Sequence, residues 1–172
     1  MNKNNIYPDN IDGPRALRCV ADGRVAPLCE LKDSIHSRRM RGDGYAVYAG
    51  TAMSRISEYF GGEVCIDVSA PTDGVVTSHE NGLTLRTGDG VSVSVILGDV
   101  EVDFIPDVGE KLRSGDVICT LPANTLSDNG IGGAVVVLFN ETDRITELHI
   151  SSGRKKTGER AAFYRIICND PR

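Results

Sequence analysis

Histidine is scarce in this chain of 172 residues, tryptophan is absent, and no two of the five cysteines form a C-x-x-C pair. Scattered cysteines in odd number favour reduced thiols over a disulfide framework, and therefore a reducing compartment. The net charge of −5 and the lack of a basic stripe argue against nucleic acid as a partner, because phosphate binding depends on clustered Lys and Arg. The short basic stretches 38–41 and 154–156 are interpreted as solvated turns.

A long apolar run is also lacking. The first 14 residues are polar and include Pro8 and Pro14, so they lack the apolar core of a signal peptide and do not form a spanning segment. We therefore expect a cytoplasmic protein without membrane insertion. The length fits one domain of ordinary size, which we place at 15–167, with a flexible polar tail at 1–14 and a C-terminal tail at 168–172.

Glycine, in contrast, is frequent, and the 19 glycines separate short segments with the period of β-strands. Residues 91–95 alternate strictly between valine and serine, as a strand with one buried face requires. Val100, Val102 and Phe104 continue that pattern. Further short strands are predicted at 18–20, 25–31, 45–48, 64–68, 83–86, 117–121, 134–139 and 161–167.

Helix is expected in only two places. Residues 53–60 have the apolar spacing of an amphipathic helix, and 141–148 follow Asn140 as a candidate N-cap. Many short strands with turn residues between them are typical of sandwiches and barrels. The sequence therefore predicts an all-β sandwich or barrel with one or two short helices.

Two pairs of segments repeat within the chain. The sequence ADGRV at 21–25 returns as TDGVV at 72–76, and a Gly-Asp-Gly turn follows each copy. A second pair, at 109–115 and 153–158, begins and ends with glycine and leads into an apolar strand. These repeats predict duplicated hairpin (hybrid) motifs, in which glycine supplies the positive φ of tight turns. A phosphate-binding loop is not expected at Gly-Asp-Gly, because a strand follows it where a helix and a lysine would be needed, and no cofactor is expected.

Several segments have the character of a known family. They are VAPL at 25–28, RGDGYAV at 41–47, VSAPTDGVV at 68–76, VGEKLRSGD at 108–116, VVVLFN at 135–140, SG at 152–153 and TGE at 157–159. In this order they resemble the glucose-type IIA component of the bacterial phosphoenolpyruvate-dependent sugar phosphotransferase system. The resemblance covers about residues 15–167. Similar turns occur in biotinyl and lipoyl carrier domains of related hairpin topology. The resemblance to the IIA family therefore depends on the order and spacing of all these segments together.

The resemblance implies a β-sandwich phosphocarrier that accepts a phosphoryl group from the protein HPr and passes it to the IIB domain of a sugar permease. In that family the acceptor is a histidine at the end of a strand, and a second histidine supports the phosphoryl oxygens. An imidazole suits this role because its unprotonated nitrogen attacks phosphorus near neutral pH and also leaves readily.

Both positions lack histidine in this chain. Counting from the Gly90-Val91 turn, the acceptor position falls on Ile96 and the supporting position on Asn81. His79 lies two residues from Asn81, and a shifted alignment would make it the supporting residue but not the acceptor. The segment that follows the family's acceptor is missing too, since only ten residues separate Gly98 from Gly109. The phosphotransfer site is therefore expected to be dismantled.

The other histidines offer no substitute site. His36 lies in a charged stretch and is interpreted as a solvated loop residue, and His149 as a satisfied residue at the end of an element. No two histidines have the spacing of a metal-ligand pair, so no metal is expected. The chain also contains no G-x-S-x-G elbow, and no cysteine has a neighbouring histidine that would lower the pKa of its thiol.

Strand period predicts where the acceptor position points. If Val91, Val93 and Val95 face the core, Ser92, Ser94 and Ile96 share the other face with Asn81, and this surface would bind a protein partner. An apolar residue on a small, polar surface fits binding without phosphorylation, but an unused site filled by drift fits as well.

The leading hypothesis is a non-catalytic regulatory or protein-interaction module with an HPr-like or permease-like partner. One alternative is an active phosphocarrier that uses an unrecognised acceptor, for which His79 is the candidate. Another alternative is a biotin or lipoyl carrier, although a lysine at a hairpin tip in the usual setting is lacking.

Overall fold

The structure is a computed structural model that describes residues 15–31, 42–49, 59, 61, 64–80, 82–129, 131, 133–140 and 144–166. Some sequence predictions fall outside these residues. They are the two tails, the helix at 53–60 except for Tyr59, and the residues His36 and Asn81.

Antiparallel strands make up most of the described chain, which confirms the predicted all-β class. A short α-helix, α3 (Ala123–Asn129), and a 3-10 helix, η1 (Leu28–Glu30), accompany them. The strands are β1 (Arg15–Arg18), β2 (Gly23–Pro27), β3 (Gly44–Tyr48), β4 (Cys65–Ser69), β5 (Gly74–Ser78), β6 (Leu83–Arg86), β7 (Ser92–Ile96), β8 (Lys111–Leu112), β9 (Val117–Pro122), β10 (Ala134–Phe139), β11 (Ile145–Ile150), β12 (Gly153–Lys155) and β13 (Arg160–Ile166).

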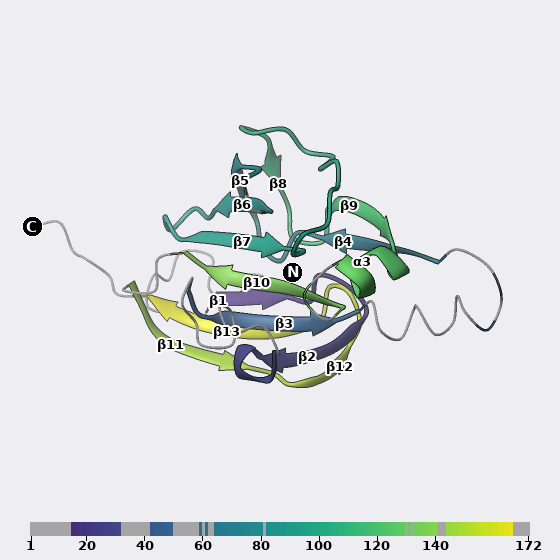
Figure 1. Cartoon of the computed structure of the whole chain (residues 1–172). Helices are drawn as coiled ribbons and strands as arrows, with labels where there is room; N and C mark the ends of the chain where they lie inside the picture. Colours follow the sequence, from purple (N-terminus) through teal and green to yellow (C-terminus); the bar gives the residue numbers. More distant parts are fainter. Residues whose placement is uncertain are drawn as a thin grey trace, which may run out of the picture.

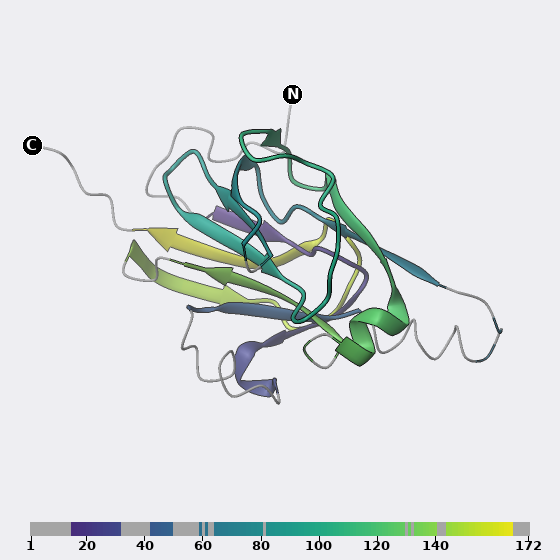
Figure 2. The same ribbon diagram turned by 45° about the horizontal axis from the view of Figure 1, so that its top comes forward.

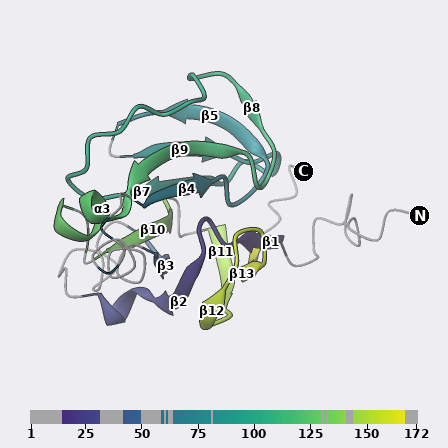
Figure 3. The ribbon, with the colours of Figure 1, turned by 90° about the vertical axis from the view of Figure 1, so that its right-hand side faces the viewer.

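The strands form three sheets. An eight-stranded sheet has the order β12-β2-β3-β10-β7-β6-β5-β8, a three-stranded sheet has the order β1-β13-β11, and β4 pairs with β9. Figures 1 and 3 show β4 to β9 gathered in one half of the molecule and β1 to β3 with β10 to β13 in the other. Helix α3 follows β9 at one end of the molecule (Figure 2).

The sheets enclose a large apolar core, and β10 lies at its centre. Every residue of β10 is buried, because this strand has neighbours on both edges and apolar residues against both faces. The rings of Phe139 and Tyr164 meet edge to face in the main core, with centroids 4.8 Å apart. A second, smaller cluster on the other face of β10 and β3 consists of Leu28, Leu31, Ala46, Ile131, Ala134, Val136 and Leu138, with Tyr48 and Ile96 packed against it.

The internal repeat is present in the hydrogen bonds. Asp22 and Asp73, which hold the same place in the two D-G copies, each accept a backbone N–H through Oδ1 at 2.7 Å. The donors are Thr157 and Ser114, which hold the same place in the second pair of repeats. The predicted duplication of hairpin motifs is therefore confirmed.

The two copies also contact each other directly. The backbone N–H of Arg18 donates to the carbonyl of Pro71, and the N–H of Ser69 donates to the carbonyl of Val20, both at 2.8 Å. The donors are equivalent positions of the two repeats, and so are the acceptors. The halves thus exchange identical bonds across an approximate two-fold relation.

Some local predictions were wrong. The helix expected at 141–148 is instead strand β11 from Ile145, because pairing with β13 supplies its backbone hydrogen bonds. Strand period does not continue through Val100 and Phe104, which form no ladder but pack partly against the main core. Helix α3 and strands β5, β8 and β12 were not among the predicted elements, and residues 28–30 of the strand predicted at 25–31 form η1 instead.

Candidate functional site

The predicted two faces of β7 are partly confirmed. Val93 and Val95 are fully buried in the main core, as is Val91 just before the strand. Ile96, the last residue of β7, is half-buried and pairs with Val136 on β10. The position that the resemblance assigns to the phosphoryl acceptor thus lies at a strand end, partly open to solvent.

Ser94 does not belong to an exposed face, contrary to the prediction. Its side chain is only 4% exposed and its Oγ lies 2.7 Å from Thr84 Oγ1 and accepts a 2.8 Å bond from Asn140 Nδ2. This bond joins β7 to the turn after β10. The Ser94 hydroxyl therefore has its hydrogen-bonding partners inside the protein. Through these partners Ser94 links β7 to β6 and to the turn after β10. Ser92 is half-buried and pairs with Arg86 on β6.

The surroundings of Ile96 are also more apolar than predicted. Ile96 packs against the second apolar cluster. Leu28 from η1 and Leu31, which follows η1, belong to this cluster together with residues of β3 and β10. The face is therefore not a small, polar surface. An isoleucine fits here because it extends a cluster that includes Leu28, Leu31 and Val136.

Asn81, the expected supporting position, lies outside the described residues. The next residue, Gly82, shows how closely the chain that enters β6 approaches β7. Gly82 has φ +100°, and a Cβ placed on it would lie 2.1 Å from the carbonyl oxygen of Val95 and 3.2 Å from Cα of Ile96. Only glycine fits this approach, since a side chain would strike backbone. The chain entering β6 therefore runs directly against the end of β7.

His79 follows β5 and lies near this place, with an exposed side chain. Its Nε2 lies 2.9 Å from the carbonyl oxygen of Pro106, and its ring lies 5.4 Å from that of Phe104. A carbonyl oxygen only accepts, so Nε2 must carry the proton, and in the neutral ring Nδ1 keeps the lone pair. His79 thus attaches the connection between β7 and β8, residues 97–110, to the turn between β5 and β6.

A pocket of about 600 Å³ opens beside the end of β7. Among the described residues that line it, the charged side chains are the carboxylates of Glu101 and Asp103, and none is a lysine or arginine. Sequence reasoning missed this pocket, although the alternation of acidic and apolar residues at 99–104 was a signal. The lining residues are His79, Gly82, Leu97, Gly98, Val100, Glu101, Val102, Asp103 and Phe104.

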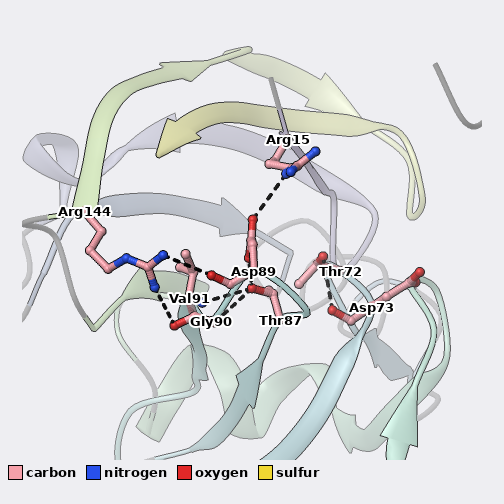
Figure 4. Close-up of polar contacts among 8 residues, drawn as sticks. All are labelled: Arg15, Thr72, Asp73, Thr87, Asp89, Gly90, Val91 and Arg144. Carbon is pink, nitrogen blue, oxygen red and sulfur yellow. Dashed lines mark hydrogen bonds and ion pairs between the residues drawn. The ribbon is translucent and has the colours of Figure 1, made fainter. Parts of the chain in front are cut away.

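The second Gly-Asp-Gly turn, 88–90, is held in place by contacts with Arg15 and Arg144, which lie far from it in the sequence. Asp89 Oδ2 forms a 3.2 Å ion pair with Arg15 Nε, and Oδ1 accepts the hydroxyl proton of Thr87. Arg144 donates to the carbonyl oxygens of Asp89 and Gly90, both at 3.1 Å (Figure 4). The turn is held through its carboxylate and carbonyls, which is the opposite of what a phosphate-binding loop presents.

Among the described residues, the other histidine, His149, and the buried thiols form no alternative catalytic centre. His149 is exposed, stacks on Phe163 and bonds Glu147, and this hydrogen bond is the main cause of the lowered pKa of Glu147. Burial raises the pKa of Cys119 to about 12, so its thiol stays protonated. Within the described ranges, no group of three or more His, Cys, Asp or Glu side chains is placed to hold a metal ion.

Comparison with known proteins found one similar curated sequence and a solved structure of similar fold. No family model matches the chain. It is 29% identical over 149 residues to the PTS system glucose-specific EIICBA component of Streptococcus pneumoniae, and the match covers 83% of this chain. The chain spans only 19% of that protein's length.

A solved structure, glucose permease IIA from Mycoplasma capricolum, has the same fold. The TM-score is 0.71 at 18% identity, and the match covers 88% of this chain and 96% of that one. None of the helices among the described residues is long and apolar enough to span a membrane. Sequence similarity along most of the chain and the shared fold together support a glucose-type IIA domain.

Proposed function

We propose that this glucose-type IIA domain has lost the phosphoryl-accepting histidine and works as a non-catalytic regulatory or protein-interaction module. The observation that carries the proposal is Ile96 at the end of β7, where the family resemblance requires the acceptor. An aliphatic side chain has no lone pair with which to attack phosphorus. Residue 96 therefore cannot accept a phosphoryl group, even if a phosphoryl donor protein docks correctly on this face.

The charge of the neighbouring pocket supports the same conclusion. A transferring phosphoryl group carries negative charge, and proteins stabilise it with cationic side chains or with converging N–H donors. The pocket that begins at Leu97, just after Ile96, instead presents Glu101 and Asp103, and none of the described residues that line it is a lysine or arginine. Like charges repel a phosphoryl group, so these surroundings oppose the binding that transfer would require.

His79 remains the competing acceptor, and its contacts weigh against it. Nε2 is engaged with the Pro106 carbonyl, which leaves Nδ1 as the nucleophilic atom. A phosphoryl group on His79 would be added to a pocket that already contains Glu101 and Asp103. Carboxylate oxygens accept hydrogen bonds and do not donate them, so phosphorylated His79 would lack the stabilising partner that the family takes from its second histidine.

The proposed partners are protein surfaces. In the family, HPr-like and permease IIB-like proteins dock at the depression around the acceptor, and the curated relative is named a glucose-specific EIICBA component. This chain keeps a half-buried apolar residue there, packed on the second apolar cluster. We propose that it still binds a cytoplasmic partner of this kind, without a phosphoryl group passing between them.

The test is a transfer assay with labelled phosphoenolpyruvate, enzyme I and HPr. The wild-type chain should remain unlabelled, while an active glucose-type IIA domain in the same tube should become labelled. An acid-labile label on the wild-type chain would contradict the proposal. The variant His79→Ala then identifies the residue: loss of the label assigns it to His79, and a retained label assigns it elsewhere.

Binding is measured separately from transfer. Titration of ¹⁵N-labelled chain with unphosphorylated HPr should shift backbone amides around 92–104 if the face still docks. Ile96→Asp is the disruptive variant, because a carboxylate placed against the second apolar cluster opposes an apolar contact. Thr146→Asp, on exposed β11, is the control for added charge. Failure of HPr and of an isolated IIB domain to shift these amides would count against a retained docking role.

A further inference from the structure

The Gly-Asp-Gly turn before β7 is surrounded by arginine side chains from distant parts of the chain. Arg15, on β1, forms an ion pair with the carboxylate of Asp89. Arg144, just before β11, instead donates to the carbonyl oxygens of Asp89 and Gly90 (Figure 4). A carbonyl oxygen carries no net charge, so these two hydrogen bonds fix the guanidinium of Arg144 in place without neutralising it.

Gly90 separates this guanidinium from a second one. Gly90 has φ +83° and no side chain, and a Cβ placed on it would lie 3.0 Å from Nη1 of Arg144 and 3.6 Å from Nη2 of Arg86. The two guanidinium groups therefore border the same small space above the turn, which a side chain at residue 90 would fill. A ligand oxygen in this space is within reach of N–H donors from both groups.

The positive charge at this space is not balanced by the protein. Arg86 is exposed at the end of β6, and its guanidinium forms no ion pair or hydrogen bond with the described residues. Two like charges this close repel each other, and the Asp89 carboxylate is already paired with Arg15. The chain as a whole has a net charge of −5, so the excess of positive charge is local to this turn. An anion that accepts hydrogen bonds from both arginines removes the repulsion.

The arrangement favours a phosphate group over other anions. Guanidinium groups bind phosphate through paired N–H···O bonds, and the two charges of a phosphate match those of two arginines. The donors are side chains from β6 and from the residue before β11, whereas the turn itself contributes open space, so this is not a phosphate-binding loop. The space lies at the start of β7, and Ile96 lies at the other end of that strand. It is therefore separate from the face proposed to bind a protein partner.

We propose that Arg86 and Arg144 bind the phosphate group of a small molecule above Gly90, either a phosphate monoester or free phosphate. The bound group links β6 to the chain that enters β11, and these segments belong to different halves of the molecule (Figure 1). Binding should therefore stabilise the fold. The proposal goes beyond the proposed interaction role and does not depend on it, because neither Ile96 nor phosphoryl transfer takes part.

The experiment titrates inorganic phosphate and glycerol phosphate, in separate samples, into the ¹⁵N-labelled full chain. Sodium chloride at matched ionic strength is the reference. Both phosphates should shift the amides of 86–91 and 144–146 with a Kd on the order of 1 mM, because the contacts are partly exposed, and chloride should not. Tighter binding of glycerol phosphate assigns the site to phosphate monoesters, and tighter or equal binding of inorganic phosphate assigns it to the phosphate group alone.

Two matched pairs of variants test the geometry. Arg86→Gln should weaken phosphate binding about fivefold, since it removes one of the two charged donors. Arg154→Gln, on exposed β12, removes the same charge elsewhere and should leave binding unchanged. Gly90→Ala fills the space between the guanidinium groups and should weaken binding, whereas Gly88→Ala should not, because a Cβ there meets nothing within 4 Å.

Thermal unfolding gives an independent readout. Phosphate should raise the unfolding midpoint of the wild-type chain more than chloride does, and Arg86→Gln should abolish most of this rise. Without phosphate, the midpoint of Arg86→Gln should not fall, because the variant relieves repulsion and breaks no contact with the described residues. This variant therefore carries the test even if Gly90→Ala does not fold.

Three results would overturn the assignment. They are shifts with phosphate no larger than those with chloride, equal effects of Arg86→Gln and Arg154→Gln on phosphate binding, and equal effects of Gly90→Ala and Gly88→Ala in folded protein. The titration measures reversible binding of an anion, whereas the transfer assay measures a covalent label. Either proposal can therefore fail without the other.

Discussion

Replacing Gly82 by alanine tests the contact that brings β6 against the end of β7. Gly82 has φ +100°, a region that costs an L-residue about 1–2 kcal/mol. A Cβ would also lie 2.1 Å from the Val95 carbonyl oxygen, so one of the two strands must move. Overpacking of this kind costs roughly 1–3 kcal/mol more. Gly82→Ala should therefore reduce the free energy of unfolding by about 2–5 kcal/mol.

Gly115→Ala is the matched control. Gly115 has a similar φ of +94°, but a Cβ there would meet nothing within 4 Å. It should therefore show only the conformational cost, about 1–2 kcal/mol. Urea unfolding of both variants gives the difference between them, which measures the contact with Val95. Equal losses of stability in the two variants would refute the close approach of β6 to the end of β7.

Two further predictions concern the repeat and a buried thiol. Asp22→Ala and Asp73→Ala should each destabilise the domain by about 1 kcal/mol, because each removes an equivalent carboxylate-to-backbone hydrogen bond; urea midpoints that differ strongly between the two would argue against the two-fold relation. The pKa of Cys119 is raised from 9.0 to about 12 by burial, so the stability that this thiol contributes is fully present below pH 9 and is lost as the pH rises toward 12. Cys119→Ala should therefore show a smaller decline of unfolding free energy over that range, and an unchanged decline would contradict the buried, protonated thiol.

The sequence predicted the fold well where a strand is defined by its own alternation of residues and by the turn residues on either side of it. Strands β6 and β10 have the predicted bounds, because Leu83–Arg86 and Ala134–Phe139 are bounded by glycine, asparagine or polar residues. The repeated D-G turns carry their own hydrogen-bonding partners. Asp22 and Asp73 therefore gave a signal that the hydrogen bonds confirm.

Predictions were wrong where pairing partners lie far along the chain. Residues from Ile145 have some helical spacing, but β13 offers an unpaired edge, and ladder bonds outweigh a weak local preference. The environment of Ile96 was misjudged for a related reason. Strand period assigned Ile96 to the outer face correctly, but only the folded chain brings Leu28 and Leu31 against that face.

The pocket required still more long-range information. His79 and Gly82 come from the turn between β5 and β6, Phe104 comes from the connection between β7 and β8, and the bond from His79 to Pro106 joins these two segments. The alternation of acidic and apolar residues at 99–104 was a signal for one side of the pocket, but nothing in its spacing from His79 indicated that the two share a cavity. Ser94 was misjudged for a different reason. A serine in an alternating strand predicts an exposed position, but the hydrogen bond from Asn140 allows Ser94 to be buried.

The most direct measurement of the central claim is the intact mass of the wild-type chain after incubation with phosphoenolpyruvate, enzyme I and HPr. With Ile96 at the acceptor position, we predict an unchanged mass, while an active glucose-type IIA domain treated in parallel gains one phosphoryl group. A gain of one phosphoryl group by this chain, lost again on mild acid treatment, would contradict the account.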